Sequence, residues 1–247
     1  MTEFTICIAC VDKHITKMEK LFESFEHYTY KPKKVIVSMS PKYLDLDLDL
    51  ETEKLRLEEK FDFLTCLVQK EITGMGENLN YTFQYVETEY ITVWGADDFF
   101  HPQYFEIMNH IIKNYCYTIL VHTYEHKLTT MTRNNPSLSH DINVFQKIDL
   151  KNIKLYDDLS LRHESGDIFR FVSRKYTKKN KRSLILYLHA GMQTFKASIL
   201  KEYKYKEGYV YDNRSDTLFL TEIFNKYKNM CVIDENLIQY VPGESYK

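Results

Sequence analysis

The chain has 247 residues, of which 44% are hydrophobic and 28% are charged, and its formal net charge is −2. This length suits one large α/β domain or two small ones, and such a chain buries roughly 70 to 75% of its unfolded surface without disulfides or a structural metal. The small net charge argues against a general nucleic-acid-binding protein. No apolar run approaches the ~20 residues that a membrane span requires, so we expect no transmembrane segment.

The cysteines and the first residues predict a cytoplasmic location. Five cysteines are an odd number, and four of them lie in apolar, strand-like runs, which is typical of reduced thiols in a protein core. Cys7 and Cys10 are three residues apart, an offset that sends side chains to opposite faces of a strand and argues against a zinc or redox pair. Because the chain enters an apolar run soon after Met1, we expect no signal peptide. Peripheral attachment to a membrane stays open.

The first 40 residues predict a strand, a helix and a second strand. Residues 4–11 form a near-continuous apolar run, which is the pattern of a central strand buried on both faces. Residues 14–28 carry apolar side chains at spacings of three and four, as in a helix that packs on a sheet. Residues 33–39 form the second strand. A βαβ unit of this kind places both strands parallel, so their carboxyl ends meet at one edge.

The next segment predicts a charged helix at 51–60 and a third strand at 61–69. Gly74 and Gly76 then open another helix. Two glycines at a helix start allow the backbone to approach a phosphate or sugar closely, although a plain turn explains them equally well.

The stretch at 90–98 carries the strongest chemical signal. Residues 90–94 are rich in β-branched and aromatic side chains and predict a buried strand. Gly95 and Ala96 follow, and then the adjacent carboxylates of Asp97 and Asp98. A carboxylate pair at the end of an apolar strand needs a cation or an open cleft, and Mg²⁺ and Mn²⁺ prefer such oxygen ligands. The alternative is an acidic loop in which Asp98 caps the next helix.

The rest of the chain continues the alternation with one gap. Between residues 123 and 182 the regular pattern is lost apart from one expected helix, and it recovers at residue 183. The elements expected after the acidic pair are a helix at 103–114, a strand at 117–122, a helix around 168–176, a strand at 184–188, a helix ending near 200, a helix ending near 227, and strands at 230–234 and 237–241.

Residues 95–102 resemble the metal-binding segment of family 2 type, GT-A fold glycosyltransferases, which reads Asp-Ala-Asp-Asp, a few residues, then His-Pro. Ala96, Asp97 and Asp98 match, as do His101 and Pro102, while Gly95 stands in place of the family's first Asp.

Three further segments resemble the same family. Residues 74–80 resemble Gly-x-Ser/Gly-x-Ala-Arg-Asn, with Asn80 as the last residue and Leu79 in place of the Arg. Residues 191–196 resemble a Gly followed by a strand that ends in Phe-Arg, with Lys196 in place of the Arg. Ser215 and Asp216 match the Ser-Asp that opens the helix carrying the family's catalytic base.

The resemblance implies a role for each matching position. Asp97 would bind Mn²⁺ or Mg²⁺, with Asp98 as the fallback ligand. Asp216 would be the general base, with Asp212 as its rival. His189 and Gly191 would bind the acceptor. The donor nucleotide-sugar would contact Ala9, Cys10, Val11, Asp12, Ser38, Gly76, Asn80, Gly95 and Ala96.

The expected fold is a single GT-A, Rossmann-like α/β domain with a mixed, mostly parallel sheet flanked by helices. Residues 1–122 would form the nucleotide-sugar-binding half, and 123–247 the acceptor-binding half with an irregular insertion at 123–182. The implied reaction transfers a sugar from a UDP- or GDP-sugar to a hydroxyl of a glycan or lipid-linked acceptor, with inversion, in glycan or polysaccharide synthesis. The alternatives are a catalytically silent GT-A fold used for binding or assembly, and a nucleotidyltransferase.

Overall fold

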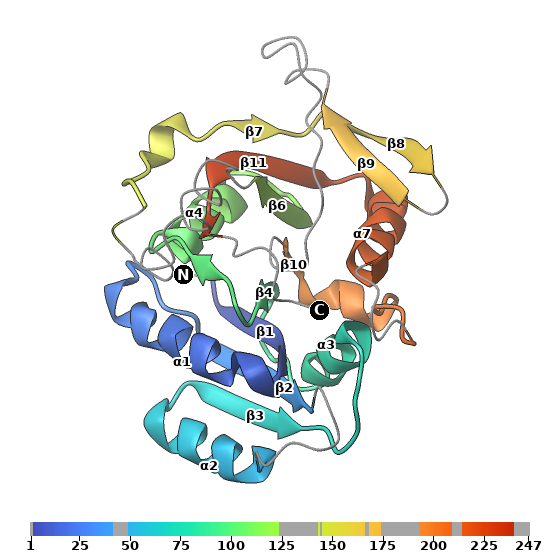
Figure 1. Cartoon of the computed structure of the whole chain (residues 1–247). Helices are drawn as coiled ribbons and strands as arrows, with labels where there is room; N and C mark the ends of the chain where they lie inside the picture. Colours follow the sequence, from blue (N-terminus) through green and yellow to red (C-terminus); the bar gives the residue numbers. More distant parts are fainter. Residues whose placement is uncertain are drawn as a thin grey trace.

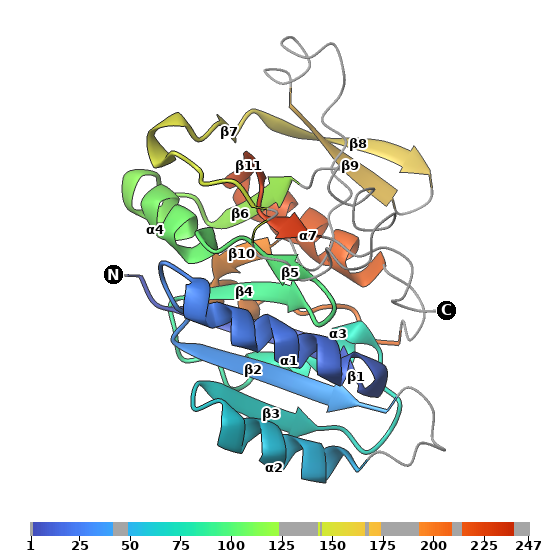
Figure 2. The same cartoon turned by 60° about the vertical axis from the view of Figure 1, so that its left-hand side comes forward.

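The computed structural model describes residues 2–41, 49–123, 143, 145–165, 168–173, 193–208 and 214–239. Within these residues the main sheet has the strand order β3-β2-β1-β4-β10-β6-β11-β7, with helices on both of its faces (Figures 1 and 2). Because most neighbouring strands run parallel and two strands run antiparallel to their neighbours, the expected mixed, mostly parallel sheet is confirmed.

The first four strands of the chain form a parallel block. They are β1 (Phe4–Val11), β2 (Lys34–Ser40), β3 (Leu64–Val68) and β4 (Tyr90–Gly95). β1 lies between β2 and β4, and Ala9 is level with Ser38 on one side and with Gly95 on the other. This register places the carboxyl ends of three strands side by side.

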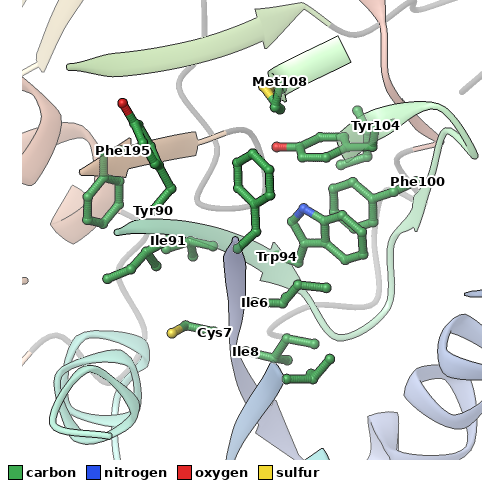
Figure 3. Close-up of a cluster of buried hydrophobic side chains, with 14 of the residues drawn as sticks. Ile6, Cys7, Ile8, Tyr90, Ile91, Trp94, Phe100, Tyr104, Met108 and Phe195 are labelled. Atoms are coloured by element: carbon green, nitrogen blue, oxygen red, sulfur yellow. The ribbon is translucent and has the colours of Figure 1, made fainter. Parts of the chain in front are cut away.

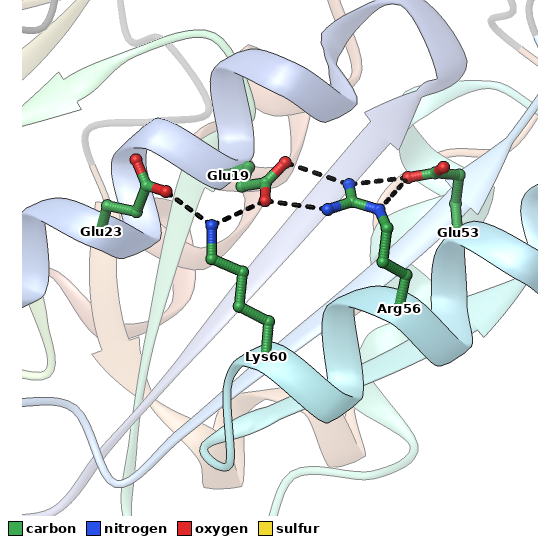
Figure 4. A network of polar contacts seen from close by, with 5 residues as sticks. All are labelled: Glu19, Glu23, Glu53, Arg56 and Lys60. Atoms are coloured by element: carbon green, nitrogen blue, oxygen red, sulfur yellow. Dashed lines mark hydrogen bonds and ion pairs between the residues drawn. The ribbon is translucent and has the colours of Figure 1, made fainter.

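The helices of the first half cover both faces of this block. α1 (Ile15–Glu23), extended by the 3-10 turns η1 (Asp12–His14) and η2 (Ser24–His27), lies on the face opposite to α3 (Met75–Phe83) (Figure 1). α2 (Leu50–Lys60) packs beside β3 and is joined to α1 by ion pairs. In Figure 4, Arg56 of α2 donates two hydrogen bonds to Glu19 of α1 at 2.9 and 3.0 Å, which lowers the pKa of Glu19 to about 2.

The second half adds one antiparallel strand to the middle of the sheet. β10 (Gln193–Lys196) enters between β4 and β6 (Ile119–Thr123) and runs antiparallel to both. β11 (Met230–Asn236) runs parallel to β6, and β7 (Leu155–Tyr156) closes that edge. The remaining helical elements of the described residues are α4 (Tyr104–Asn114), η5 (Leu150–Asn152), η7 (Ala197–Lys201) and α7 (Arg214–Tyr227).

Two small pairings lie outside the main sheet. β5 (Phe99–Phe100) pairs with β12 (Ile238–Gln239), and β8 (Leu159–Ser165) forms a hairpin with β9 (Ile168–Ser173). The helix predicted at 168–176 is therefore wrong. The segment Ile-Phe-Arg-Phe-Val is rich in β-branched and aromatic residues, which favour a strand, and the ring of Phe171 packs on Phe224 of α7 at 5.0 Å.

The core is rich in aromatic residues beneath the end of β4. Trp94 is buried and stacks on Phe100 with ring centroids 3.8 Å apart, and Tyr104 packs edge-on against both rings (Figure 3). This packing fixes the chain immediately before and after the acidic pair.

The cysteines, the lengths of the helices and two further predicted elements can be compared with the structure in the same way. All five cysteines are free thiols, and four of them are buried, with Cys116 exposed. Every helix in the described parts of the chain is too short or too polar to cross a bilayer. The predicted strand at 184–188 lies outside the described residues, and the predicted helix ending near 200 is the 3-10 helix η7.

Candidate active site

Polar side chains gather at the carboxyl ends of β1, β2 and β4. Ala9, Cys10 and Val11 are the last residues of β1, and Asp12 follows at the start of η1. Asp12 is buried, and its Oδ1 accepts a hydrogen bond from the backbone N–H of Lys13 at 2.6 Å. Carboxyl ends of strands are where ligands bind in open α/β sheets. The fold thus brings together the residues predicted on these strands.

The turn after β4 brings the carboxylate of Asp98 against Gly95. A Cβ atom at Gly95 would collide with Oδ2 of Asp98, and it would lie 3.6 Å from Oδ1 of Asp97. The carboxylate of Asp98, which is fully buried, therefore takes the space that a side chain at position 95 would need. The alternative in which Asp98 caps a helix is wrong, because β5 follows it and the residue before α4 is Gln103.

His14 is a member of this site that the sequence did not reveal. Its Nε2 lies 4.0 Å from Oδ2 of Asp97, and both side chains are largely buried. η1 carries His14 back across the end of β1, and β1 and β4 are neighbours, so the two residues meet although they lie far apart in the sequence. In the sequence, the predicted parallel strands were the only indication that His14 and Asp97 could lie close together.

Asn78 is a second residue that sequence reasoning missed. Its Oδ1 accepts a hydrogen bond from Ser38 Oγ at 2.6 Å, and its Nδ2 donates to Ser40 Oγ at 3.1 Å and to the carbonyl of Gly74 at 3.2 Å. Ser38 was predicted to contact the donor, and the structure shows its hydroxyl buried and bonded to this amide. α3 is thereby tied to the end of β2.

Gly76 and Asn80 face a different segment of the chain. A Cβ at Gly76 would collide with the carbonyl oxygen of Lys206, so the close backbone approach expected here is made to the chain itself. The side-chain amide of Asn80 bonds to the backbone of Tyr205 in both directions. Contact of either residue with the donor stays a prediction.

His101 and Gln103 bind the backbone of Gln146 and Ile148, respectively. The Nδ1 atom of His101 accepts the backbone N–H of Gln103 at 3.0 Å, so the other ring nitrogen, Nε2, donates to the carbonyl of Gln146 at 2.9 Å. Burial lowers the pKa of His101, in agreement with a neutral ring. Gln103 adds two hydrogen bonds to the backbone of Ile148. The segment that follows the acidic pair and β5 is therefore bonded to the backbone of Gln146 and Ile148.

Of the remaining predicted residues, the structure places Asp216, which lies in α7. This helix begins at Arg214, so Asp216 lies in its first turn as predicted, whereas Ser215 lies inside the helix and is not its N-cap. Asp212, His189 and Gly191 lie outside the described residues.

The described residues fit a divalent cation that is shared with a substrate. Among them, no group of three His, Cys, Asp or Glu side chains could enclose a metal ion. Mg²⁺ and Mn²⁺ in phosphate-transfer sites need only one or two carboxylates, because water and phosphate oxygens complete the shell. Asp97 and Asp98 beside Gly95 supply such a pair at the strand end.

Comparisons with known proteins agree with this arrangement. The sequence profile described as glycosyl transferase family 2 matches residues 5–204. No curated protein sequence matches the chain.

Solved structures share the fold at low sequence identity. S. aureus TarS 1–349 in complex with UDP-GlcNAc has a TM-score of 0.61 and 14% identity, and the match covers 99% of this chain and 60% of that one. Glucosyl-3-phosphoglycerate synthase from Mycobacterium tuberculosis, in complex with Mn²⁺, UDP and glucosyl-3-phosphoglycerate, has a TM-score of 0.58 and 10% identity, with 99% and 73% covered. The chain thus spans about 60% of the TarS 1–349 structure. These similarities confirm a single GT-A, Rossmann-like fold.

Proposed function

Because this chain belongs to glycosyl transferase family 2, we propose that it moves a sugar from a nucleoside diphosphate sugar to an acceptor hydroxyl. The observation that carries this proposal is the polar edge at the ends of β1, β2 and β4, where the nearly buried Asp97 lies beside His14. Buried carboxylates need a compensating charge, and a divalent cation that also binds the diphosphate would supply one.

The donor would lie across the ends of β1 and β2. Asp12, Ser38 and the backbone of Ala9, Cys10 and Val11 would contact the base and ribose, and Gly95 and Ala96 would contact the donor at the end of β4. UDP-sugars are the first donors to test, since the TarS structure holds UDP-GlcNAc and the mycobacterial synthase holds UDP. GDP-sugars are the second choice.

Asp97 would hold Mn²⁺ or Mg²⁺, with Asp98 as the second carboxylate. When bound, such an ion offsets the negative charge that builds on the diphosphate as the bond from the anomeric carbon to the phosphate oxygen breaks. The mycobacterial synthase, whose structure contains Mn²⁺, supports manganese as the ion to try first. His14 would keep the Asp97 carboxylate in place.

Asp216 would take the proton of the acceptor hydroxyl. The acceptor oxygen forms its bond to the anomeric carbon from the face opposite to the leaving diphosphate, which inverts the configuration, and its proton passes to the carboxylate. Asp216 lies in the first turn of α7, where the helix dipole favours an ionised carboxylate. Asp212 is the alternative base.

The acceptor side is proposed more broadly. Residues 123–247, including His189 and Gly191, would select a glycan or lipid-linked acceptor, and the protein would act in glycan or polysaccharide synthesis in the cytoplasm or at its membrane surface.

A donor panel tests the proposal. The protein is incubated with UDP- and GDP-sugars, with and without Mn²⁺, while thermal shift reports binding, free nucleotide reports cleavage, and proton NMR reports the anomeric configuration of the product. We expect one donor to raise the melting temperature and to be cleaved only with the metal. Binding without cleavage or transfer for every donor would instead identify a binding module, and release of diphosphate from a nucleoside triphosphate would identify a nucleotidyltransferase.

A further inference from the structure

The segment at 205–208 fills the space between α3 and α7. Asn80 of α3 pairs with Tyr205 as one strand pairs with another: its Oδ1 accepts the Tyr205 N–H at 2.9 Å, and its Nδ2 donates to the Tyr205 carbonyl at 2.8 Å. Nδ2 also donates to Oε1 of Glu207 at 2.9 Å. One turn away, Glu77 Oε1 accepts the backbone N–H of Gly208 at 2.6 Å. The segment is thus fixed to α3 over its whole length.

The same segment is fixed to α7 by side chains. The ring of Tyr205 stacks on Phe219 with centroids 4.2 Å apart and an angle of 16° between the rings. Its hydroxyl donates to Gln193 Oε1 at 2.9 Å, which ties the ring to β10. Lys206 forms an ion pair with Glu222 at 3.7 Å. Phe219 is fully buried and follows Asp216 by less than one helical turn.

We propose that Asn80 and Tyr205 are positioning residues that set the place of the first turn of α7 relative to the donor edge. α3 is bound to the end of β2 through Asn78 and to the 205–208 segment through Asn80. This helix therefore connects the donor edge with the segment that packs on α7. The inference rests on the proposed role of Asp216 as the base. It gives Asn80 a different role from donor binding, because both atoms of its amide are bonded to Tyr205 and Glu207.

The energetic reason lies in the precision that proton transfer needs. A general base works within hydrogen-bond reach of the proton that it abstracts, and a displacement of about 1 Å can lower the rate by ~100-fold. Loss of the Asn80 amide removes one hydrogen bond from the Tyr205 N–H and one from its carbonyl, both of which are buried, so the segment and the helix stacked on it shift or loosen. The donor edge, which is formed by other residues, keeps its shape.

The first experiment compares Asn80→Ala with Asn109→Ala. Asn109 lies on α4 and accepts one hydrogen bond from the backbone of Thr2, so its loss removes a similar contact far from α7. We expect Asn80→Ala to lower kcat by ~10- to 100-fold while the donor KM and the Kd for UDP with Mn²⁺ stay within about twofold. Amide hydrogen exchange in the first turns of α7 should become faster in this variant only.

A paired substitution separates positioning from simple destabilisation. Asn80→Asp keeps the acceptor for the Tyr205 N–H but loses the donor and repels Glu207. Adding Glu207→Gln restores a hydrogen bond between positions 80 and 207, in which the new amide at position 207 donates to the new carboxylate at position 80. We expect Asn80→Asp to lower kcat and the double variant to recover at least about tenfold of that loss, which a donor-binding Asn80 would not do.

The outcomes distinguish this inference from the proposed function. A weaker Kd for UDP in Asn80→Ala at unchanged kcat would assign Asn80 to donor binding and overturn the inference. Unchanged exchange in α7 of Asn80→Ala and of Asn80→Asp would also overturn it, whatever the activity. A parent protein that cleaves and transfers from no donor would refute the proposed function, while the exchange data still decide whether Asn80 places α7.

Discussion

Two regions of the described structure bury different kinds of polar group. At the carboxyl ends of β1 and β4, Asp12, His14, Asp97 and Asp98 are buried and ionisable. In the middle of the sheet, where β10 enters, three buried hydroxyl groups form a cluster. Thr194 Oγ1 lies 2.8 Å from Thr92 Oγ1 and 3.1 Å from the Tyr104 hydroxyl. Hydroxyls that satisfy one another cost little to bury, whereas charges need a partner or a ligand.

We therefore expect the residues of the first region to contribute to binding and catalysis, and those of the second region to contribute to stability. Changes at the strand ends and at α7 should alter binding or rate at nearly constant stability, and changes at the β10 junction should alter stability at nearly constant affinity. The following predictions test that separation, beginning with the largest expected effect.

The largest effect is expected for Asp216→Asn. Removal of a general base lowers the rate by 10² to 10⁴, or roughly 3 to 5 kcal/mol, while donor binding stays intact because the amide has nearly the same shape. Steady-state kinetics and calorimetry with UDP and Mn²⁺ measure the two quantities. Asp212→Asn is the matched control, and the assignment fails if Asp212→Asn abolishes transfer while Asp216→Asn does not.

At the β10 junction, Thr194→Val should lower the free energy of unfolding by roughly 1 to 3 kcal/mol, because the hydroxyls of Thr92 and Tyr104 each lose a buried partner. Urea unfolding measures the loss, and the affinity for UDP should change by less than about twofold. Thr65→Val on the edge strand β3 is the half-buried control and should be nearly neutral. A large loss of UDP affinity in Thr194→Val would erase the distinction between the two regions.

At the strand ends, Asp97→Ala should weaken binding of UDP with Mn²⁺ by at least about tenfold, or 1.4 kcal/mol, without lowering the melting temperature. The carboxylate lies near that of Asp98, so its removal relieves repulsion in the free protein, which offsets the lost contact with His14, while it removes the metal ligand. The exposed Asp62→Ala is the control in the same calorimetric titration. Equal affinity in Asp97→Ala and the parent would place the metal elsewhere.

The smallest effect is a pH dependence that arises from His101. Burial lowers the pKa of His101 in the folded protein below its ordinary value. Above about pH 6.5 the ring is neutral in both states, and below it the unfolded chain takes up a proton that the folded chain does not, so stability falls by at most about 1.4 kcal/mol per pH unit. Urea unfolding of the parent and of His101→Gln at pH 8 and pH 5.5 should show the steeper loss in the parent. Parallel losses would exclude His101 as the cause.

Local patterns predicted much of the fold because they report burial directly. The apolar run at 4–11 gave the bounds of β1 without error, and the spacing after residue 214 gave a helix that ends at Tyr227. The hairpin strand β9 was predicted as a helix. Its small sheet depends on pairing with β8 and on contact with α7, which a local window does not contain.

The site was predictable where a single strand end carries it. Asp97 comes two residues after the end of β4, so a short motif sufficed. His14 and Asn78 were missed because their partners, Asp97 and the serines of β2, come from other strands, and only the sheet order brings them together. At Gly76 the need for a close approach was predicted correctly, but the chain's own Lys206 carbonyl is what approaches it.

The fit between Gly95 and Asp98 has a consequence for how this motif can vary. A side chain at position 95 requires the Asp98 carboxylate to turn away from its present place, because Oδ2 of Asp98 lies where the new Cβ atom would be. The rotamer of residue 98 therefore depends on whether residue 95 has a side chain. In relatives that carry an aspartate at both positions, the second carboxylate must point in another direction than Asp98 does in this chain.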